Sequence, residues 1–217
     1  RSLAEMAAAY FFLTALIHMP LANVTAILQA LPLTVALGAA LFLREDVGWR
    51  RFLAIGIGFA GVYLIVRPGA DGFSIYAGYA LLAVVAVTIR DLMARQISQD
   101  VQSLTVALAA VIAILAFASV GALFGPVWEP VSPLDWLWLA GTIVTIIGGY
   151  LFSVSAMRHG EIGFVAPFRY SSLLVALILG LLIFEEWPDA VTLLGAAIVV
   201  ATGLFTLWRE RQYAKGS

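Results

Sequence analysis

The sequence predicts an all-α, polytopic membrane protein. Of its 217 residues, 63% are hydrophobic and only 12% are charged, and the mean hydropathy of +1.01 is far above that of soluble domains. The apolar residues form long continuous runs instead of the alternating pattern of a membrane β-barrel. Because only helices and closed barrels satisfy their backbone hydrogen bonds in a bilayer, we expect these runs to be transmembrane helices.

We count about eight such runs. Most approach the ~20 residues that a helix needs to cross the hydrocarbon core. Short segments rich in Gly, Pro and charged residues separate them, as expected for turns between packed helices. All six tryptophan residues lie close to a predicted helix end, where an indole ring favours the membrane interface. The predicted helices span residues 3–18, 23–43, 49–66, 74–94, 103–124, 135–157, 162–184 and 190–208.

The positive charges favour one orientation of these helices. If both ends of the chain lie on the same side, that side carries ten of the twelve Lys and Arg residues, whereas the other side has only Arg67, and Arg169 lies within a helix. Cytoplasmic loops are rich in Lys and Arg. We therefore expect a multi-pass protein of the cytoplasmic (inner) membrane with both ends of this chain in the cytoplasm. The ten residues are Arg1, Arg44, Arg50, Arg51, Arg90, Arg95, Arg158, Arg209, Arg211 and Lys215.

The chain contains an internal repeat. Residues 15–45 resemble residues 156–185 at an offset of about 140, so that a Val-Ala-Leu triplet beginning at Val35 recurs at Val175. Five predicted crossings separate the two copies, and an odd number of crossings reverses direction, so the copies are inverted. A unit of five helices would require two helices upstream of this chain, giving a ten-helix 5+5 protein. We expect residues 1–68 to form the last three helices of the first repeat, residues 74–208 the five-helix second repeat, and residues 209–217 a cytoplasmic tail.

Arg169 is the most informative polar residue. It lies about seven residues into the helix predicted at 162–184, or roughly 10 Å from its start. A guanidinium at that depth needs an anion, a carbonyl oxygen or water. Pro167 removes a helical hydrogen bond, and Tyr170 and Ser171 add hydroxyl groups. We expect this group to bind a substrate carboxylate or phosphate; the alternative is that Arg169 reaches the interface or satisfies broken backbone.

Gln29 corresponds to Arg169 in the repeat and also lies beside a proline, Pro32. The repeat would place both near the interface between the two halves, where inverted-repeat transporters bind their substrates. The alternative for Gln29 is a simple interhelical hydrogen bond. We expect Pro32 and Pro167 to break their helices. Tyr10 is a further candidate for lining the cavity, although a lipid or core contact is the commoner role of such a residue.

Several other residues could couple or gate transport. Asp91 is a carboxylate within a predicted helix, and it either exchanges protons or forms an ion pair with Arg95 at a spacing of four residues. Such a pair lowers the pKa of a carboxyl group and disfavours proton exchange. His18 and His159 end equivalent helices, where they either sense pH or cap the helix at the interface. Polar residues early in the second predicted helix, Asn23 and Thr25, are expected to cap its start.

The prolines and small residues also resemble a known family. The first copy contains Leu31-Pro32, Glu45 and the stretch 61–65, and the second contains the stretch 166–170 and Glu185. Together they resemble the drug/metabolite transporter superfamily, in particular its EamA-type members, over essentially the whole chain except the first two helices of a ten-helix fold. The resemblance implies a secondary transporter that moves small organic solutes or metabolites, with amino-acid-like and other anionic compounds among the candidates, across the inner membrane by alternating access. Because the superfamily spans amino acids, metabolites, drugs and nucleotide sugars, the substrate and the direction of transport stay open.

Composition weakens the other classes of function. There is no cysteine and there are only two histidines, so we expect no metal and no cofactor. An intramembrane enzyme or a structural or channel protein is the alternative, but H-E-x-x-H and G-x-S-x-G motifs are absent from the sequence and rings of pore charges are not evident. We expect a small-molecule substrate and the lipid bilayer as partners, and no nucleic acid. Small-residue faces such as that of Gly56 favour close helix packing within the protein, and a homodimer is the further role that they could serve.

Overall fold

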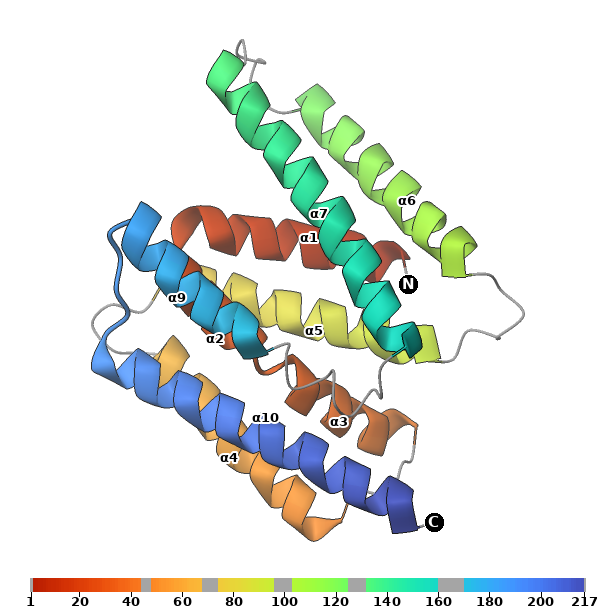
Figure 1. The fold of residues 1–217 in the computed structure, drawn as a ribbon, viewed down its shortest axis with the longest axis vertical. Coiled ribbons are helices and arrows are strands. Elements are labelled where there is room, and N and C mark those ends of the chain that lie inside the picture. The colour runs from red at the N-terminus through yellow and green to blue at the C-terminus, as the bar shows by residue number, and fades with distance from the viewer. Residues whose placement is uncertain are drawn as a thin grey trace.

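A computed structural model describes residues 2–43, 48–67, 74–95, 103–124, 132–159 and 170–216. These residues are helical almost throughout, and no strand occurs among them (Figure 1). The all-α class predicted from the sequence is confirmed. The helices are α1 (Ser2–His18), α2 (Leu21–Leu28), α3 (Leu31–Phe42), α4 (Trp49–Val66), α5 (Ile75–Arg95), α6 (Ser103–Phe124), α7 (Pro133–His159), α9 (Ser171–Ile183) and α10 (Ala190–Gly216).

Most predicted helix bounds agree with these helices to within two residues. Two differ. The helix predicted at 23–43 consists of two helices, α2 and α3, and α10 continues to Gly216 through residues that we expected to form a tail. The extension is explained by the Arg, Glu, Gln, Ala and Lys residues of this segment, all good helix formers. The start of the helix predicted at 162–184, including Pro167 and Arg169, lies outside the described residues.

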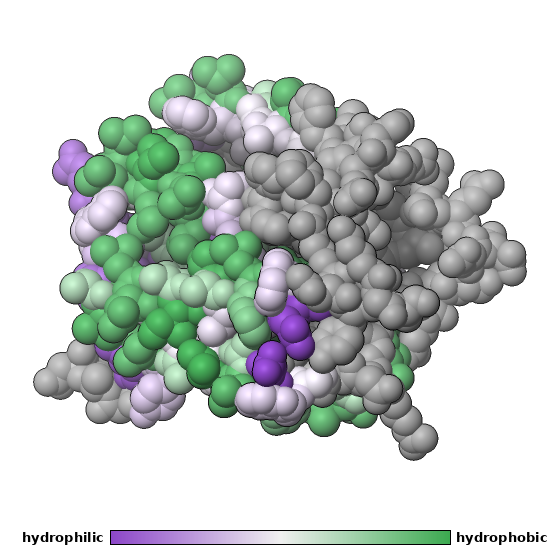
Figure 2. Space-filling view, turned by 60° about the horizontal axis from the view of Figure 1, so that its bottom comes forward, coloured by the Kyte–Doolittle hydropathy of each residue, from purple (hydrophilic) through white to green (hydrophobic). Residues whose placement is uncertain are grey.

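The described helices have the length and surface of membrane-spanning segments. Three stretches are long and apolar enough to cross a bilayer, and five apolar helical stretches are shorter. Large apolar side chains cover much of the exposed surface, which is the surface that lipid would contact (Figure 2). Within the described ranges these eight stretches correspond to the eight predicted spans. The long ones are Leu21–Phe42, Ile75–Met93 and Ala190–Arg209; the short ones are Ser2–His18, Phe52–Val66, Val111–Leu123, Pro133–Gly149 and Ser171–Ile183.

A tight turn at Gln29 and Ala30 separates α2 from α3. The Ala30 N–H donates to the carbonyl of Ile27 at 3.1 Å, a bond three residues back instead of the four of an α-helix. Pro32, at the start of α3, has no N–H and cannot donate to the Leu28 carbonyl. The missing donor and the tighter turn together interrupt the helix, which explains why one predicted span is two helices.

Helices α4 and α10 pack against each other in opposite directions along most of their length (Figure 1). A Cβ atom on Gly61 would lie 2.8 Å from the Gly195 carbonyl oxygen, and a Cβ atom on Gly195 would lie 2.6 Å from the Gly61 carbonyl oxygen. The two backbones therefore touch at a point where only glycine fits. At one end of this pair, Arg67 forms an ion pair with Asp189.

The buried faces of α4 and α10 match at a constant offset of 141 residues. Five buried positions of α4 recur as buried positions of α10, so each helix turns the equivalent face towards the other. This is the pattern expected of an inverted repeat with its two-fold axis between the two helices. The division into repeats at residues 68–74 stays a prediction. The matching pairs are Ala54 and Gly195, Ile55 and Ala196, Gly58 and Val199, Val62 and Gly203, and Ile65 and Thr206.

Helix α5 connects the remaining described helices of the first half, because it packs on α1 and α3. The hydroxyl oxygens of Thr34 in α3 and Thr88 in α5 lie 2.6 Å apart. Each hydroxyl also lies within hydrogen-bond distance of a carbonyl oxygen of its own helix, Leu31 for Thr34 and Val84 for Thr88, so either hydroxyl can be the donor between the two helices. One turn further along, the side chain of Leu92 fills the space beside Gly38. The two helices therefore run in the same direction, held by a hydrogen bond and a small residue.

Replacing Gly61 by leucine should destabilise the protein, because the new side chain would collide with the Gly195 backbone in α10. Overpacking of this kind typically costs about 1–3 kcal/mol. Thermal unfolding of the purified protein in detergent should therefore show a lower Tm. Gly56→Leu on the same helix is the matched control, since nothing lies within 4 Å of a Cβ atom at that position. An equal loss of Tm in both variants would contradict the close α4–α10 contact.

Candidate functional site

Gln29 lies at the centre of the described bundle. It sits in the turn between α2 and α3, about 12 Å along the helix axis from the start of α2. Its side chain is buried, with only 6% of the residue exposed. The Nε2 atom donates to the backbone carbonyl of Tyr170 at 3.2 Å and to the Ser172 hydroxyl oxygen at 3.3 Å. One amide group therefore joins the break in the first half of the chain to the start of α9 in the second half.

The start of α9 is a second helix end within the bundle. Tyr170 is the residue before α9, and no side chain caps the first N–H groups of that helix. These groups carry the positive end of the helix dipole. The Tyr170 side chain is itself buried and lies against Gly203 of α10, where any Cβ atom would collide with the phenol oxygen. Gly203 thus provides the space that fixes the Tyr170 ring.

Helix α3 also begins without a side-chain cap, but it offers fewer N–H groups, because Pro32 has none and the Leu33 N–H donates to the Ala30 carbonyl at 3.0 Å. Its N-cap residue is Ala30. Since α3 and α9 are only 12 and 13 residues long, neither spans a hydrocarbon core of about 30 Å by itself. Helices that begin at bilayer depth bring N–H groups and polar side chains to a place where they can bind polar or anionic molecules.

Asn23 adds a polar atom that the sequence did not single out as part of a site. Its Oδ1 atom is buried, and no described residue donates a hydrogen bond to it. We expected Asn23 and Thr25 to cap the helix start, but α2 begins at Leu21 with Pro20 at its N-cap, so both residues lie inside the helix. That expectation is wrong. The Thr25 hydroxyl instead donates to the Leu21 carbonyl one turn back, at 2.8 Å. The sequence signal that could have identified Asn23 as a buried polar residue was its place as a single Asn among apolar residues.

The structure brings together some of the predicted site residues. Gln29 donates directly to the Tyr170 carbonyl, and its second acceptor is the hydroxyl of Ser172, whereas we expected Ser171. Ser171 is exposed and lines a groove between α9 and α10. Arg169 and Pro167 fall on residues that the structure does not describe, so their roles stay predictions.

Tyr10 lies elsewhere. It is half exposed on α1, and its ring meets those of Phe11 and Phe117 edge to face at centroid distances of 5.5 and 6.3 Å. These contacts place it between α1 and α6. No contact within the described ranges joins Tyr10 to Gln29 or Tyr170, so its role in a cavity stays a prediction.

Asp91 belongs to a group of three charged residues that joins α1 to α5. Arg90 donates to Asp91 at 2.8 Å and to Glu5 at 2.9 Å, and all three side chains are between one fifth and one third exposed. We expected Arg95 as the partner of Asp91, but its side chain lies outside the description. The ion pair that we expected as the alternative to proton exchange therefore forms with Arg90. A coupling role for Asp91 stays a prediction.

His18 is the last residue of α1. Its Nδ1 atom lies 2.8 Å from the Thr14 carbonyl and so carries the hydrogen, and its ring stacks on Tyr76 at a centroid distance of 4.0 Å. His18 therefore hydrogen-bonds the last turn of its own helix and contacts the first turn of α5. His159 ends α7, but its side chain is not described. Among the described residues no group of three His, Cys, Asp or Glu side chains could hold a metal ion.

Asp189 stabilises the end of the α4–α10 pair at which α4 ends and α10 begins. Its Oδ1 atom accepts a hydrogen bond from the Thr192 N–H at 2.8 Å, which caps the start of α10, and it forms the ion pair with Arg67. The bond from Thr192 is the main reason that the pKa of Asp189 lies below its usual value; burial opposes this shift and Arg67 adds to it. Arg67 itself ends α4 in the left-handed conformation, with φ of 48°.

These features define a multi-pass α-helical membrane protein with polar groups gathered at broken helices. The chain belongs to the EamA-like transporter family, whose model matches residues 2–67 and 74–208. The two matched segments cover nearly all of the described helices. The family is one of transporters, not enzymes.

Several curated relatives are similar to this chain. The S-adenosylmethionine uptake transporter of Rickettsia conorii is 27% identical over 197 residues, which cover 89% of this chain and 65% of that protein. The riboflavin transporter of Vibrio cholerae is 30% identical over 190 residues, covering 86% and 63%. The pseudopaline exporter of Pseudomonas aeruginosa is 29% identical over 198 residues, covering 88% and 66%. The chain thus spans just under two thirds of the length of these relatives. No solved structure matches it.

Replacing Gln29 by leucine should lower the stability of the protein, because it removes both hydrogen bonds between the α2–α3 turn and α9. Interhelical hydrogen bonds in membranes are typically worth about 0.6 kcal/mol and at most roughly 2 kcal/mol. A modest fall in Tm should follow, measured by thermal unfolding in detergent. Thr142→Val is the control, since the Thr142 hydroxyl donates only within its own helix, to the Trp138 carbonyl. An unchanged Tm in Gln29→Leu would contradict a stabilising bridge.

The pKa of Asp189 predicts a weak dependence of stability on pH. Because folding lowers this pKa, the ionised Asp189 carboxylate stabilises the folded state. This stabilisation is complete above the usual Asp pKa of about 3.9 and is lost as the pH falls below that value. The Asp189 side chain is 57% exposed, so the effect should stay below about 1 kcal/mol. Unfolding curves recorded between neutral and acidic pH should show a smaller acid-induced loss in Asp189→Asn. Identical pH profiles in the wild type and in Asp189→Asn would contradict a stabilising role of the Asp189 carboxylate at the start of α10.

Proposed function

We propose that the protein is a secondary transporter that moves small organic solutes across the cytoplasmic membrane by alternating access between its two inverted halves. The observation that carries the proposal is the bridge from Gln29 to Tyr170 and Ser172. It joins the interruption between α2 and α3 to the start of α9. Membership of the EamA-like transporter family and the names of the relatives support the same class of activity.

The bridge is suited to a site that must open and close. Its two hydrogen bonds are 3.2 and 3.3 Å long, and each is weak enough in a membrane for a polar substrate group to replace it. A substrate that accepts a hydrogen bond from the Gln29 amide would separate α9 from the α2–α3 turn. Release of the substrate would let the bridge form again. Binding and the relative movement of the halves would then be linked through the same atoms.

Arg169 supplies the charge in this proposal. It precedes Tyr170 directly, so it belongs to the segment that leads into the bridge. A guanidinium in this segment would favour a carboxylate or phosphate on the substrate. We assign Gln29, Tyr170 and Ser171 to hydrogen bonding with that substrate, and Tyr10 to the wall of its path.

The direction of transport is not transferred from the relatives. One is named for uptake and another for export, and their named compounds differ. We place both ends of the chain in the cytoplasm from the distribution of Lys and Arg. Three residues stay candidates for coupling transport. His18 and His159 lie at helix ends, and Asp91 is already held in an ion pair by Arg90. A homodimer through the exposed face of α4 belongs to the same proposal.

Transport assays on the intact protein in proteoliposomes test the proposal. Uptake or efflux of at least one anionic metabolite should saturate with concentration. In Arg169→Ala, loss of a charge-assisted hydrogen bond worth about 1.5–3 kcal/mol should raise the KM for that solute roughly tenfold to a hundredfold. Gln29→Leu should raise it less, because the Gln29 amide is uncharged.

Thr142→Val is the control for both variants and should transport normally. Unchanged KM values for every anionic solute in Arg169→Ala would overturn the anion site while leaving transport intact. Absence of saturable movement for a broad panel of metabolites would overturn the transporter assignment itself.

A further inference from the structure

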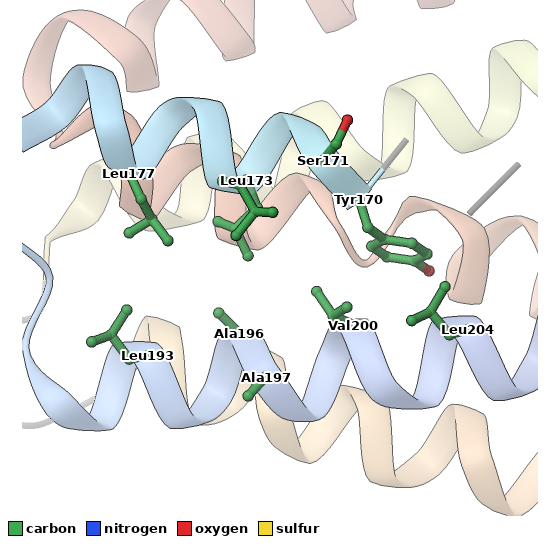
Figure 3. A pocket seen from close by; sticks show the side chains of 10 residues that line it. Tyr170, Ser171, Leu173, Leu177, Leu193, Ala196, Ala197, Val200 and Leu204 are labelled. Carbon is green, nitrogen blue, oxygen red and sulfur yellow. The ribbon is translucent and has the colours of Figure 1, made fainter. Parts of the chain in front are cut away.

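A groove of about 540 Å³ runs between α9 and α10 (Figure 3). Its walls are almost entirely apolar, and the Tyr170 ring lies at one end. The turn at residues 184–189 joins the two helices at the other end. The main wall residues are Leu173 and Leu177 of α9 and Leu193, Ala196, Val200 and Leu204 of α10.

The corresponding positions in the first half carry larger side chains. At the offset of 141 that relates the buried faces of α4 and α10, four of the five groove residues of α10 replace a bulkier residue of α4, whereas Ala197 replaces Gly56. Ile55 is buried in the core, with 2% of its surface exposed, and Phe59 packs against that core. Ile55 and Phe59 therefore fill interior space beside α4, whereas the smaller Ala196 and Val200 leave the corresponding space beside α10 open. Phe52 and Tyr63, the other two bulkier residues, are exposed. The pairs are Phe52 and Leu193, Ile55 and Ala196, Phe59 and Val200, and Tyr63 and Leu204.

The groove has the length of one lipid leaflet. Leu193 and Leu204 are eleven residues apart on a helix, or about 16 Å, which is roughly half of a 30 Å hydrocarbon core. Both residues lie within the span Ala190–Arg209, so the groove is at bilayer depth. Trp187, exposed next to its outer end, marks the interface where an acyl chain would enter.

The surroundings favour hydrocarbon as the occupant. Leu174 lines the groove and Leu194 lies on its α10 side, and both are more than half exposed, so the groove continues into the apolar surface that faces lipid. Water would find few polar partners on these walls. An empty apolar space would forfeit the dispersion contacts of its lining.

We propose that this groove binds one acyl chain of a membrane phospholipid. The chain enters beside Trp187, follows α10 inward and ends against the Tyr170 ring. Tyr170 also accepts the hydrogen bond of Gln29 through its carbonyl, so the lipid contacts the residue that joins α9 to the central helix break. The acyl chain fills the space between α9 and α10. In the first half, the side chains of Ile55 and Phe59 fill the corresponding space beside α4.

A photoreactive lipid tests this directly. The intact protein is reconstituted in vesicles of phosphatidylcholine containing a phosphatidylcholine with a diazirine near the end of one acyl chain, and the adducts are mapped by mass spectrometry. We expect adducts on residues 173–177 and 196–204. In the double variant Ala196→Ile with Val200→Phe, which carries the residue types of the first half, these adducts should fall about tenfold because the added side chains occupy the buried path of several methylene groups.

Ala201→Ile is the matched control, since Ala201 is exposed on α10 outside the groove and its variant should label like the wild type. Val200→Phe alone serves if the double variant does not fold, as judged by circular dichroism and gel filtration. Equal labelling of wild type and groove variant would overturn the proposal. So would crosslinks between two copies of the protein at these residues.

Discussion

The hydrogen bonds of Gln29 are the interaction on which the arrangement of the described helices depends. A polar amide at bilayer depth must find partners, because no water is available to it there. Gln29 finds them in Tyr170 and Ser172, on the other half of the chain. The position of α9 follows from this requirement, since among the described helices α9 packs mainly on α2.

The α4–α10 pair has the opposite character. Its backbones touch at Gly61 and Gly195, and its one end is fixed by Arg67 and Asp189. Close contact of this kind is difficult to shift without breaking many dispersion contacts at once. We therefore see α4 and α10 as the fixed part of the bundle. Helix α9 is the part that can move, because two long hydrogen bonds hold it and an apolar groove separates it from α10. The proposed acyl chain would fill that separation without rigid bonds.

Much of the fold could be predicted from the sequence, and the reasons are local. Long apolar runs indicated the helices because each residue carries its own hydropathy, and the bounds of α4 and α6 agree with the prediction at both ends. Gln29 stood out as a polar residue beside a proline. Its partners could not be predicted, since they lie more than 140 residues away. The pairing of Glu5 with Arg90 was missed for the same reason, as was the burial of Asn23 Oδ1.

The sequence by itself thus determined that this is an all-α membrane protein with an internal repeat and polar residues at particular helical positions. Composition and hydropathy pattern are properties of the chain alone, and the bilayer allows few ways to satisfy them. Only the tertiary structure decided that Gln29 reaches Tyr170 and Ser172, that Gly203 makes room for the Tyr170 ring, and that the α9–α10 groove is open. Those outcomes depend on how side-chain volumes of distant helices fit together, and no single stretch of sequence contains that information.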